Sequence, residues 1–140
     1  MKRVLLGAVA AAMVSATLGA APRTADAPAT IVLNVPVTAT SRTDGTIFPK
    51  LGDSVTFGVS FPRSAQKYDP RIQVLCYQNG DLVYGEAGPY YQEFLLGGAM
   101  SLWFLGDGAA SCHADLYYWS YQGSQKFNLL ASTEFDAAGR

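Results

Sequence analysis

The chain has 140 residues, of which 49% are apolar and 15% are charged, and its formal net charge is −1. This length and composition are typical of one globular domain and exclude a disordered or fibrous chain. Residues 72–140 contain two basic side chains against seven acidic ones. A nucleic-acid binder needs a basic face that releases phosphate counterions, so we expect no nucleic-acid partner.

The first segment, residues 1–20, has the pattern of a secretory signal peptide. Two basic residues supply its positive start, an uncharged run rich in Ala, Val and Leu follows, and small residues surround the expected cleavage point after Ala20. An uncleaved membrane anchor is the alternative, but the run is just short of the roughly 20 residues of a comfortable span. We therefore expect a secreted or otherwise extracytoplasmic protein of the cell envelope, with no membrane insertion after signal cleavage.

A linker over residues 21–29 contains small residues and two prolines, and it leads into one domain over 30–136. In this domain short β-rich runs alternate with turn clusters, and no run has a helical period. Pro36 indicates an edge strand or a bulge in the first run, and residues 63–70 read as a polar loop. The predicted strands are 30–40, Ser54–Phe61, Arg71–Gln78, Asp81–Glu86, Tyr90–Leu96, Met100–Leu105, Ala110–Tyr121 and Lys126–Phe135.

Turn signals separate the predicted strands. Asn79-Gly80 is the strongest hairpin signal in the chain, because both central positions of that turn type need a positive φ. The run Ser54–Phe61 alternates strictly between apolar and small or polar residues. About eight short strands separated by turn residues predict an all-β sandwich or a small barrel.

The two cysteines, Cys76 and Cys112, predict one disulfide, since an exported chain with an even number of cysteines usually pairs them. Such a bond would close a loop of about 36 residues and stabilise the fold by roughly 3–4 kcal/mol. Two buried free thiols are the alternative. A metal site would need further ligands, and only His113 is near in sequence.

Two stretches of the chain resemble the immunoglobulin-like fold. Residues 106–118 (Gly-Asp-Gly-Ala-Ala-Ser-Cys-His-Ala-Asp-Leu-Tyr-Tyr) are similar to the turn into its strand F, where an Asp and a small residue precede the second Cys. Ser54–Phe61, which follows Leu51-Gly52-Asp53, is similar to its strand B. The resemblance implies an immunoglobulin-like antiparallel β-sandwich of about 7–8 strands with one disulfide. In style the chain resembles small exported immunoglobulin-like proteins of bacteria.

The chain departs from that pattern in two places. The strand B run has no cysteine, and Cys76 instead falls on the strand that corresponds to C, while Ser111 stands where a corner tyrosine is expected. If strands C and F are neighbours, the disulfide joins adjacent strands of one sheet and braces a face rather than the core. The fold hosts many functions, so the resemblance implies no particular one.

The sequence shows no catalytic motif. His113 and Asp115 stand two residues apart and so share one side of a strand, where a surface histidine beside an acid is the plainer interpretation. A hydrolase or metal-dependent enzyme built on this pair is the enzymatic alternative. Paired carboxylates for glycosidase chemistry could come from Glu86, Glu93, Asp107 and Asp115. We predict a protein that is not an enzyme and holds no cofactor and no metal.

The more informative feature is aromatic. One parity of the long strand 110–121 carries Tyr117, Trp119 and Tyr121, and Tyr77 on the paired strand should share that face. Such a face can stack sugar rings or form a protein interface, or it can simply pack under a loop. The candidate binding residues are Tyr77, Tyr117, Trp119, Tyr121, Asp115 and Gln73.

These residues predict a non-enzymatic binding or adhesion module that recognises a glycan or a protein at the cell surface. The alternative is a structural or assembly subunit of an extracellular complex, which pairs with other chains or with itself through exposed edge strands.

Overall fold

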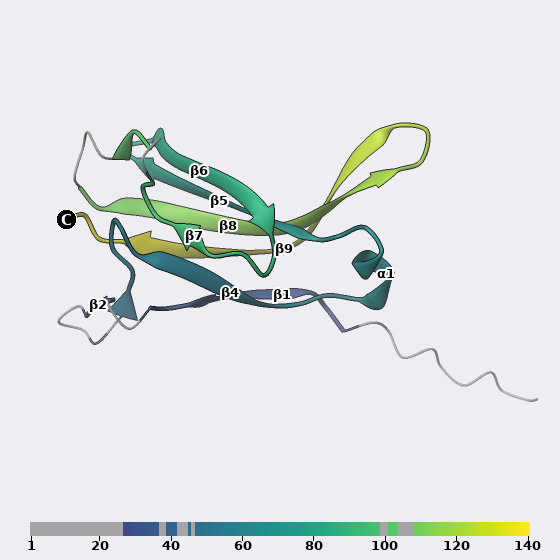
Figure 1. Ribbon diagram of the computed structural model, residues 1–140, viewed down its shortest axis with the longest axis horizontal. Helices are drawn as coiled ribbons and strands as arrows, with labels where there is room; N and C mark the ends of the chain where they lie inside the picture. Colours follow the sequence, from purple (N-terminus) through teal and green to yellow (C-terminus); the bar gives the residue numbers. More distant parts are fainter. Residues whose placement is uncertain (1–26, 37–38, 42–44, 46, 99–100, 104–107) are drawn as a thin grey trace, which may run out of the picture.

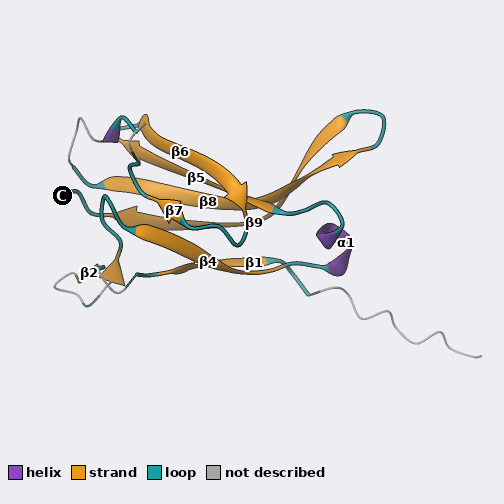
Figure 2. Cartoon of the chain, in the orientation of Figure 1, coloured by secondary structure: helices purple, strands orange, loops and turns teal. Residues whose placement is uncertain are grey.

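The computed structural model describes residues 27–36, 39–41, 45, 47–98, 101–103 and 108–140. The predicted signal peptide, residues 1–20, and most of the predicted linker lie outside this part of the chain. Figures 1 and 2 show a β-rich domain in which strands form two layers. Its elements are β1 (Thr30–Asn34), β2 (Thr40–Ser41), β3 (Ile47–Phe48), β4 (Ser54–Ser60), α1 (Arg63–Gln66), β5 (Arg71–Gln78), β6 (Asp81–Pro89), β7 (Phe94–Leu95), β8 (Ala110–Tyr121) and β9 (Gln125–Ala137).

The two layers are a three-stranded sheet of order β1-β4-β7 and a four-stranded sheet of order β6-β5-β8-β9. All strand pairings within them are antiparallel, and β2 and β3 form a separate antiparallel pair. Side chains from both sheets form one buried core, which includes Val55 and Phe57 of β4 and Ile72, Val74 and Leu116 of the other sheet. The predicted all-β class with antiparallel sheets is confirmed.

Local sequence explains the best-defined strands. β4 and β5 alternate as predicted, because β-branched and aromatic side chains at every second position fill the core while the residues between them face outward. β5 and β8 have the predicted bounds. Asn79 and Gly80 adopt φ values of 51° and 88°, as the predicted hairpin turn between β5 and β6 requires.

Other predicted elements differ. The predicted loop 63–70 contains α1, a single turn after Pro62 that is too short to produce a helical period in the sequence. Of the predicted strand Tyr90–Leu96 only β7 remains, since the chain folds back in a turn where the Gln92 N–H donates to the Pro89 carbonyl. Residues 101–103 of the predicted strand Met100–Leu105 are not extended strand, and the rest of it lies outside the described residues.

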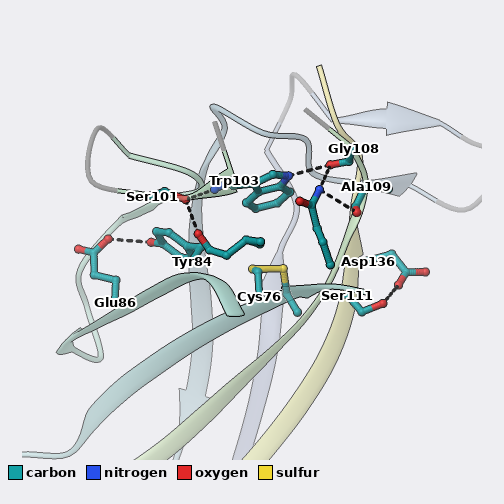
Figure 3. Close-up of a disulfide and its surroundings, with 12 residues drawn as sticks. Cys76, Tyr84, Glu86, Ser101, Trp103, Gly108, Ala109, Ser111 and Asp136 are labelled. Atoms are coloured by element: carbon teal, nitrogen blue, oxygen red, sulfur yellow. Dashed lines mark hydrogen bonds between the residues drawn. A yellow bond between two sulfur atoms is a disulfide. The ribbon is translucent and has the colours of Figure 1, made fainter. Parts of the chain in front are cut away.

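The predicted disulfide between Cys76 and Cys112 is present, and it joins β5 to β8 within one sheet. The expectation that it braces a face rather than the core is wrong. Both cysteines share the inward parity of β5 and β8, and both are buried. Trp103, which is fully buried, belongs to the same core cluster, and its indole N–H donates to the Gly108 carbonyl at 2.7 Å (Figure 3).

Candidate functional site

The predicted binding residues lie on the outer face of the four-stranded sheet, but they fall into separate groups. The registers of β5 and β8 place Gln73 directly opposite Asp115 and Arg71 directly opposite Tyr117. The Asp115 carboxylate accepts a hydrogen bond from the Ser132 hydroxyl of β9 at 2.5 Å. Its other oxygen lies 3.8 Å from Nε2 of His113. Gln73 and Asp115 therefore form the polar middle of this face.

Tyr77 lies at one end of the face, away from the other predicted aromatic residues. It pairs with Ser111, and its ring stacks on His113 with the ring centres 5.8 Å apart. From Ser111 to Trp119 is eight residues of extended strand, which span about 26 Å at about 3.3 Å per residue. Tyr77 and Trp119 share one face of the sheet, as the strand alternation predicts, but they are too far apart to contact the same small ligand.

The opposite end of the face carries an aromatic cluster. Figure 1 shows that the β8–β9 hairpin continues past the rest of its sheet, and we call this extension, residues 117–129, the arm. Tyr117 stacks on Phe127 at 5.0 Å between ring centres, and Trp119 meets both rings edge-on, at 6.3 Å and 5.3 Å. Tyr117 is buried beneath its neighbours. The arm thus has a small apolar centre of its own, separate from the main core.

Much of this cluster is open to solvent. The exposed fractions are 37% for Trp119, 43% for Phe127, 55% for Leu129 and 71% for Tyr121. We define the arm face as Tyr117, Trp119, Tyr121, Phe127 and Leu129. The alternation of β8 predicts its first three members, whereas Phe127 and Leu129 were not among the predicted binding residues. A single strand pattern could not reveal them, because Phe127 and Leu129 share the parity of Phe135, which packs against the main core.

A β-bulge explains the placement of Phe127 and Leu129. Between β8 and β9 the register shifts after Leu116, which pairs with Ala131, whereas Tyr117 pairs with Leu129. Leu130 is therefore the extra residue on β9. One extra residue reverses the parity of everything beyond it, so Phe127 and Leu129 turn to the outer side beside Trp119 and Tyr117.

The inner side of the arm is supported by the segment after α1. Tyr68 stacks on Tyr118 with the rings 4.8 Å apart and nearly parallel, and Nζ of Lys67 lies 4.8 Å from the centre of the Tyr68 ring. The Asn128 side-chain amide donates to the Ser120 hydroxyl across the arm. These contacts hold the arm in a defined position, with its apolar side facing outward.

His113 and Asp115 are the pair on which the enzymatic alternative rests. Around Tyr77 and His113 lies a hollow of about 420 Å³ whose wall includes Glu134 and Asp136. Within the part of the chain that the structure describes, no group of three or more His, Cys, Asp or Glu side chains is arranged to hold a metal ion. His113 has Asp115 as its close acidic neighbour, and its ring stacks on Tyr77.

The chain matches no protein-family model, no curated protein and no solved structure. Among the described residues, no helix has the length and apolar character needed to cross a membrane. The geometry of the arm face is therefore the main observation on which a function can be built.

Proposed function

We propose that the protein is a non-enzymatic binding module of the cell exterior and that it binds another protein through the arm face. One observation carries the proposal: Trp119, Phe127, Leu129 and Tyr121 form a contiguous, partly exposed apolar patch on a projecting hairpin. Contiguous exposed apolar patches mark interaction sites, whereas single exposed apolar residues need no explanation.

The composition of the patch favours a protein over a glycan. Phe127 and Leu129 have no side-chain hydrogen-bonding group, and a sugar hydroxyl buried against them would lose its water without compensation. The Trp119 and Phe127 rings lie at 70° to one another, so they do not form one flat platform for a sugar ring. Trp, Tyr and Arg dominate protein interfaces energetically, and Arg71 borders the patch opposite Tyr117.

The size of the patch fits the centre of an interface. From the exposed fractions, these side chains present roughly 400 Å² of apolar surface. A standard interface buries about 800 Å² on each partner, with an apolar centre and a polar rim. The polar rim would come from neighbouring residues such as Arg71, Gln73 and Asp115.

We also propose that the domain is immunoglobulin-like. Strand order supports this, because β1-β4-β7 opposite β6-β5-β8-β9 corresponds to strands A, B and E opposite C′, C, F and G of that fold. Export from the cytoplasm is part of the proposal. The disulfide supports it, since disulfides persist mainly in oxidising compartments.

The test compares two variants that lose exposed apolar surface at different places on the domain. Immobilised protein is offered extracts of cell-envelope proteins and, in parallel, insoluble polysaccharides. The arm variant combines Trp119→Ser with Phe127→Ser, and the control variant is Leu95→Ser, a half-exposed position on β7 in the other sheet. Melting curves establish that both variants are folded.

We expect a captured protein to bind the wild type and the control variant equally and the arm variant at least tenfold more weakly. Equal binding by the arm variant would contradict the proposal. Retention on a polysaccharide that only the arm variant loses would favour a glycan ligand instead. A concentration-dependent dimer that the arm variant abolishes would make the arm face a contact between copies of this chain.

A further inference from the structure

A second surface lies at the opposite edge of the four-stranded sheet from the arm's outer strand. β6 is the edge strand there, and beside it runs a groove of about 450 Å³. Tyr84 and Glu86 of β6 line one side of it, and Ser101 and Leu102 line the other (Figure 3 shows the first three). The groove shares no residue with the arm face, so it is a separate candidate for binding.

The hydrogen-bond pattern of the sheet identifies which β6 groups are unpaired. The Cα atoms of Cys76 and Cys112 are 4.0 Å apart, which is the spacing of a non-hydrogen-bonded pair between β5 and β8. The backbone groups of Cys76 must then turn to its other neighbour, Tyr84 of β6. By alternation Glu86 also bonds to β5, whereas the N–H and C=O groups of Gly85 and Ala87 point to the open edge.

Both ends of this edge are closed, and its middle is open. At one end Val83 is a bulged residue that has no partner on β5. Its carbonyl accepts a hydrogen bond from the Ser101 hydroxyl at 2.6 Å. At the other end Pro89 has no N–H to donate, and its carbonyl already accepts a hydrogen bond from the Gln92 N–H at 3.0 Å. Bulges and covering segments are the usual protection of an edge strand, and here they leave Gly85 and Ala87 exposed.

The groove combines one carboxylate with apolar walls. Glu86 accepts hydrogen bonds from the Tyr84 hydroxyl and the Gln92 amide, each at 2.7 Å. No described Lys, Arg or His side chain lies within ion-pair distance of it. Leu82 and Leu102 are large, exposed apolar side chains on the wall. A ligand that complements this groove has a positive charge for Glu86 and an apolar group for the leucines.

We propose that the β6 edge binds an extended peptide segment as a fifth strand of the sheet, with a lysine or arginine of that segment paired to Glu86. Backbone hydrogen bonds to Gly85 and Ala87 supply affinity, as in other cases of strand addition. Every second side chain of the added strand faces the groove, where it meets Leu102, Tyr84 or Glu86. This inference does not depend on the function proposed for the arm face.

A display library of random linear octapeptides tests the proposal on the full exported chain. Enriched peptides are synthesised with blocked ends, and their affinities are measured by titration.

The first variant is Ala87→Pro, which removes an N–H that the β5–β6 ladder does not use, and proline is tolerated at such edge positions. Ala87→Ser keeps the N–H and is its matched control. Glu86→Gln removes the charge and keeps a hydrogen-bonding side chain, and Trp119→Ala removes the centre of the arm face.

We expect enriched peptides to alternate basic and apolar residues and to lose at least tenfold in affinity with Ala87→Pro. Ala87→Ser and Trp119→Ala should bind as the wild type does. Glu86→Gln should weaken basic peptides several-fold and reduce the salt dependence of binding. In amide exchange, bound peptide should slow the exchange of Gly85 and Ala87. The proposal would be overturned if the wild type enriched no peptides, or if Ala87→Pro left the affinity unchanged. If only Trp119→Ala removed the affinity, the peptides would bind at the arm face instead.

Discussion

Cys76 and Cys112 lie directly opposite one another on β5 and β8, and the bond between them crosses the two central strands of the four-stranded sheet. The two cysteines are 36 positions apart in the sequence, and the chain between them includes β6 and β7. The bond therefore connects the strand before the chain crosses to the other sheet with the strand after its return. The bond therefore holds together the sheet that carries both proposed binding surfaces.

Replacing both cysteines by alanine should lower the free energy of unfolding by about 3–4 kcal/mol, because the unfolded chain regains the freedom of a closed loop. Urea unfolding of the oxidised wild type and of the double variant measures the difference. Wild type unfolded under reducing conditions is the control, and it should match the double variant. Equal stability of oxidised and reduced wild type would contradict the expectation.

Leu95 and Leu96 are sequence neighbours with opposite environments, since Leu96 is fully buried in the core and Leu95 is half exposed. Leu96→Ala should cost about 2–5 kcal/mol through lost burial and the cavity that remains. Leu95→Ala should change stability by no more than about 0.5 kcal/mol. Denaturant unfolding of both variants compares them directly, and similar losses at the two positions would show that the chain between β7 and Gly97 is placed differently.

Tyr84 should cause the free energy of unfolding to fall in alkaline solution. Its burial, followed by its hydrogen bond to Glu86 and the charge of that carboxylate, raises the pKa of the Tyr84 hydroxyl above its usual value of about 10. A raised pKa in the folded state leaves stability unaffected below about pH 10 and reduces it as pH rises further, because only the unfolded chain releases the proton readily.

The comparison for Tyr84 is with Tyr84→Phe, which has no proton to release. Free energies of unfolding measured between neutral pH and pH 11 should fall more steeply for the wild type than for this variant. Tyr121→Phe, at an exposed site, should keep the wild-type slope. Parallel curves for wild type and Tyr84→Phe would show that Tyr84 ionises equally in both states.

Fluorescence of the two tryptophans should distinguish the buried position of one from the partly exposed position of the other. Trp103 is fully buried, whereas Trp119 is 37% exposed on the arm face. The variant Trp119→Phe retains only Trp103. Its tryptophan emission should therefore lie at shorter wavelength than that of the wild type and should resist quenching by acrylamide. Tyr121→Phe keeps both tryptophans and serves as the control. Strong quenching of the remaining tryptophan in Trp119→Phe would contradict the buried position of Trp103.

The sequence predicted those parts of the fold that depend on local pattern. β5 and β8 have the expected bounds, because a period of two in apolar residues is a direct consequence of the pleated strand. The turn at Asn79 and Gly80 was equally readable, since few residue pairs accept two successive positive φ values. The disulfide followed from the count of cysteines in a chain expected to be exported. The signal peptide and the absence of enzymatic activity remain predictions.

Part of the candidate site could be predicted in the same way. The alternation of β8 placed Tyr117, Trp119 and Tyr121 on one side of a strand, and the structure gathers the first two into the arm cluster. Their separation from Tyr77 could not be read, because it depends on the register between β5 and β8. A strand pattern specifies which face a residue occupies, and pairing with another strand decides how far along that face it lies.

Local pattern in the sequence therefore predicts β4, β5 and β8, their inward and outward residues, and the turn that joins β5 to β6. Contacts between distant segments set the rest: Leu130 forms a bulge, Phe127 and Leu129 consequently join Trp119 on the outer face, and hydrogen bonds to the Val83 and Pro89 carbonyls close the two ends of the β6 edge. These two groups of features differ in the range of the interactions that produce them. Backbone geometry and side-chain alternation act within a few residues, whereas register, bulges and edge protection arise from contacts between segments that are distant in the chain.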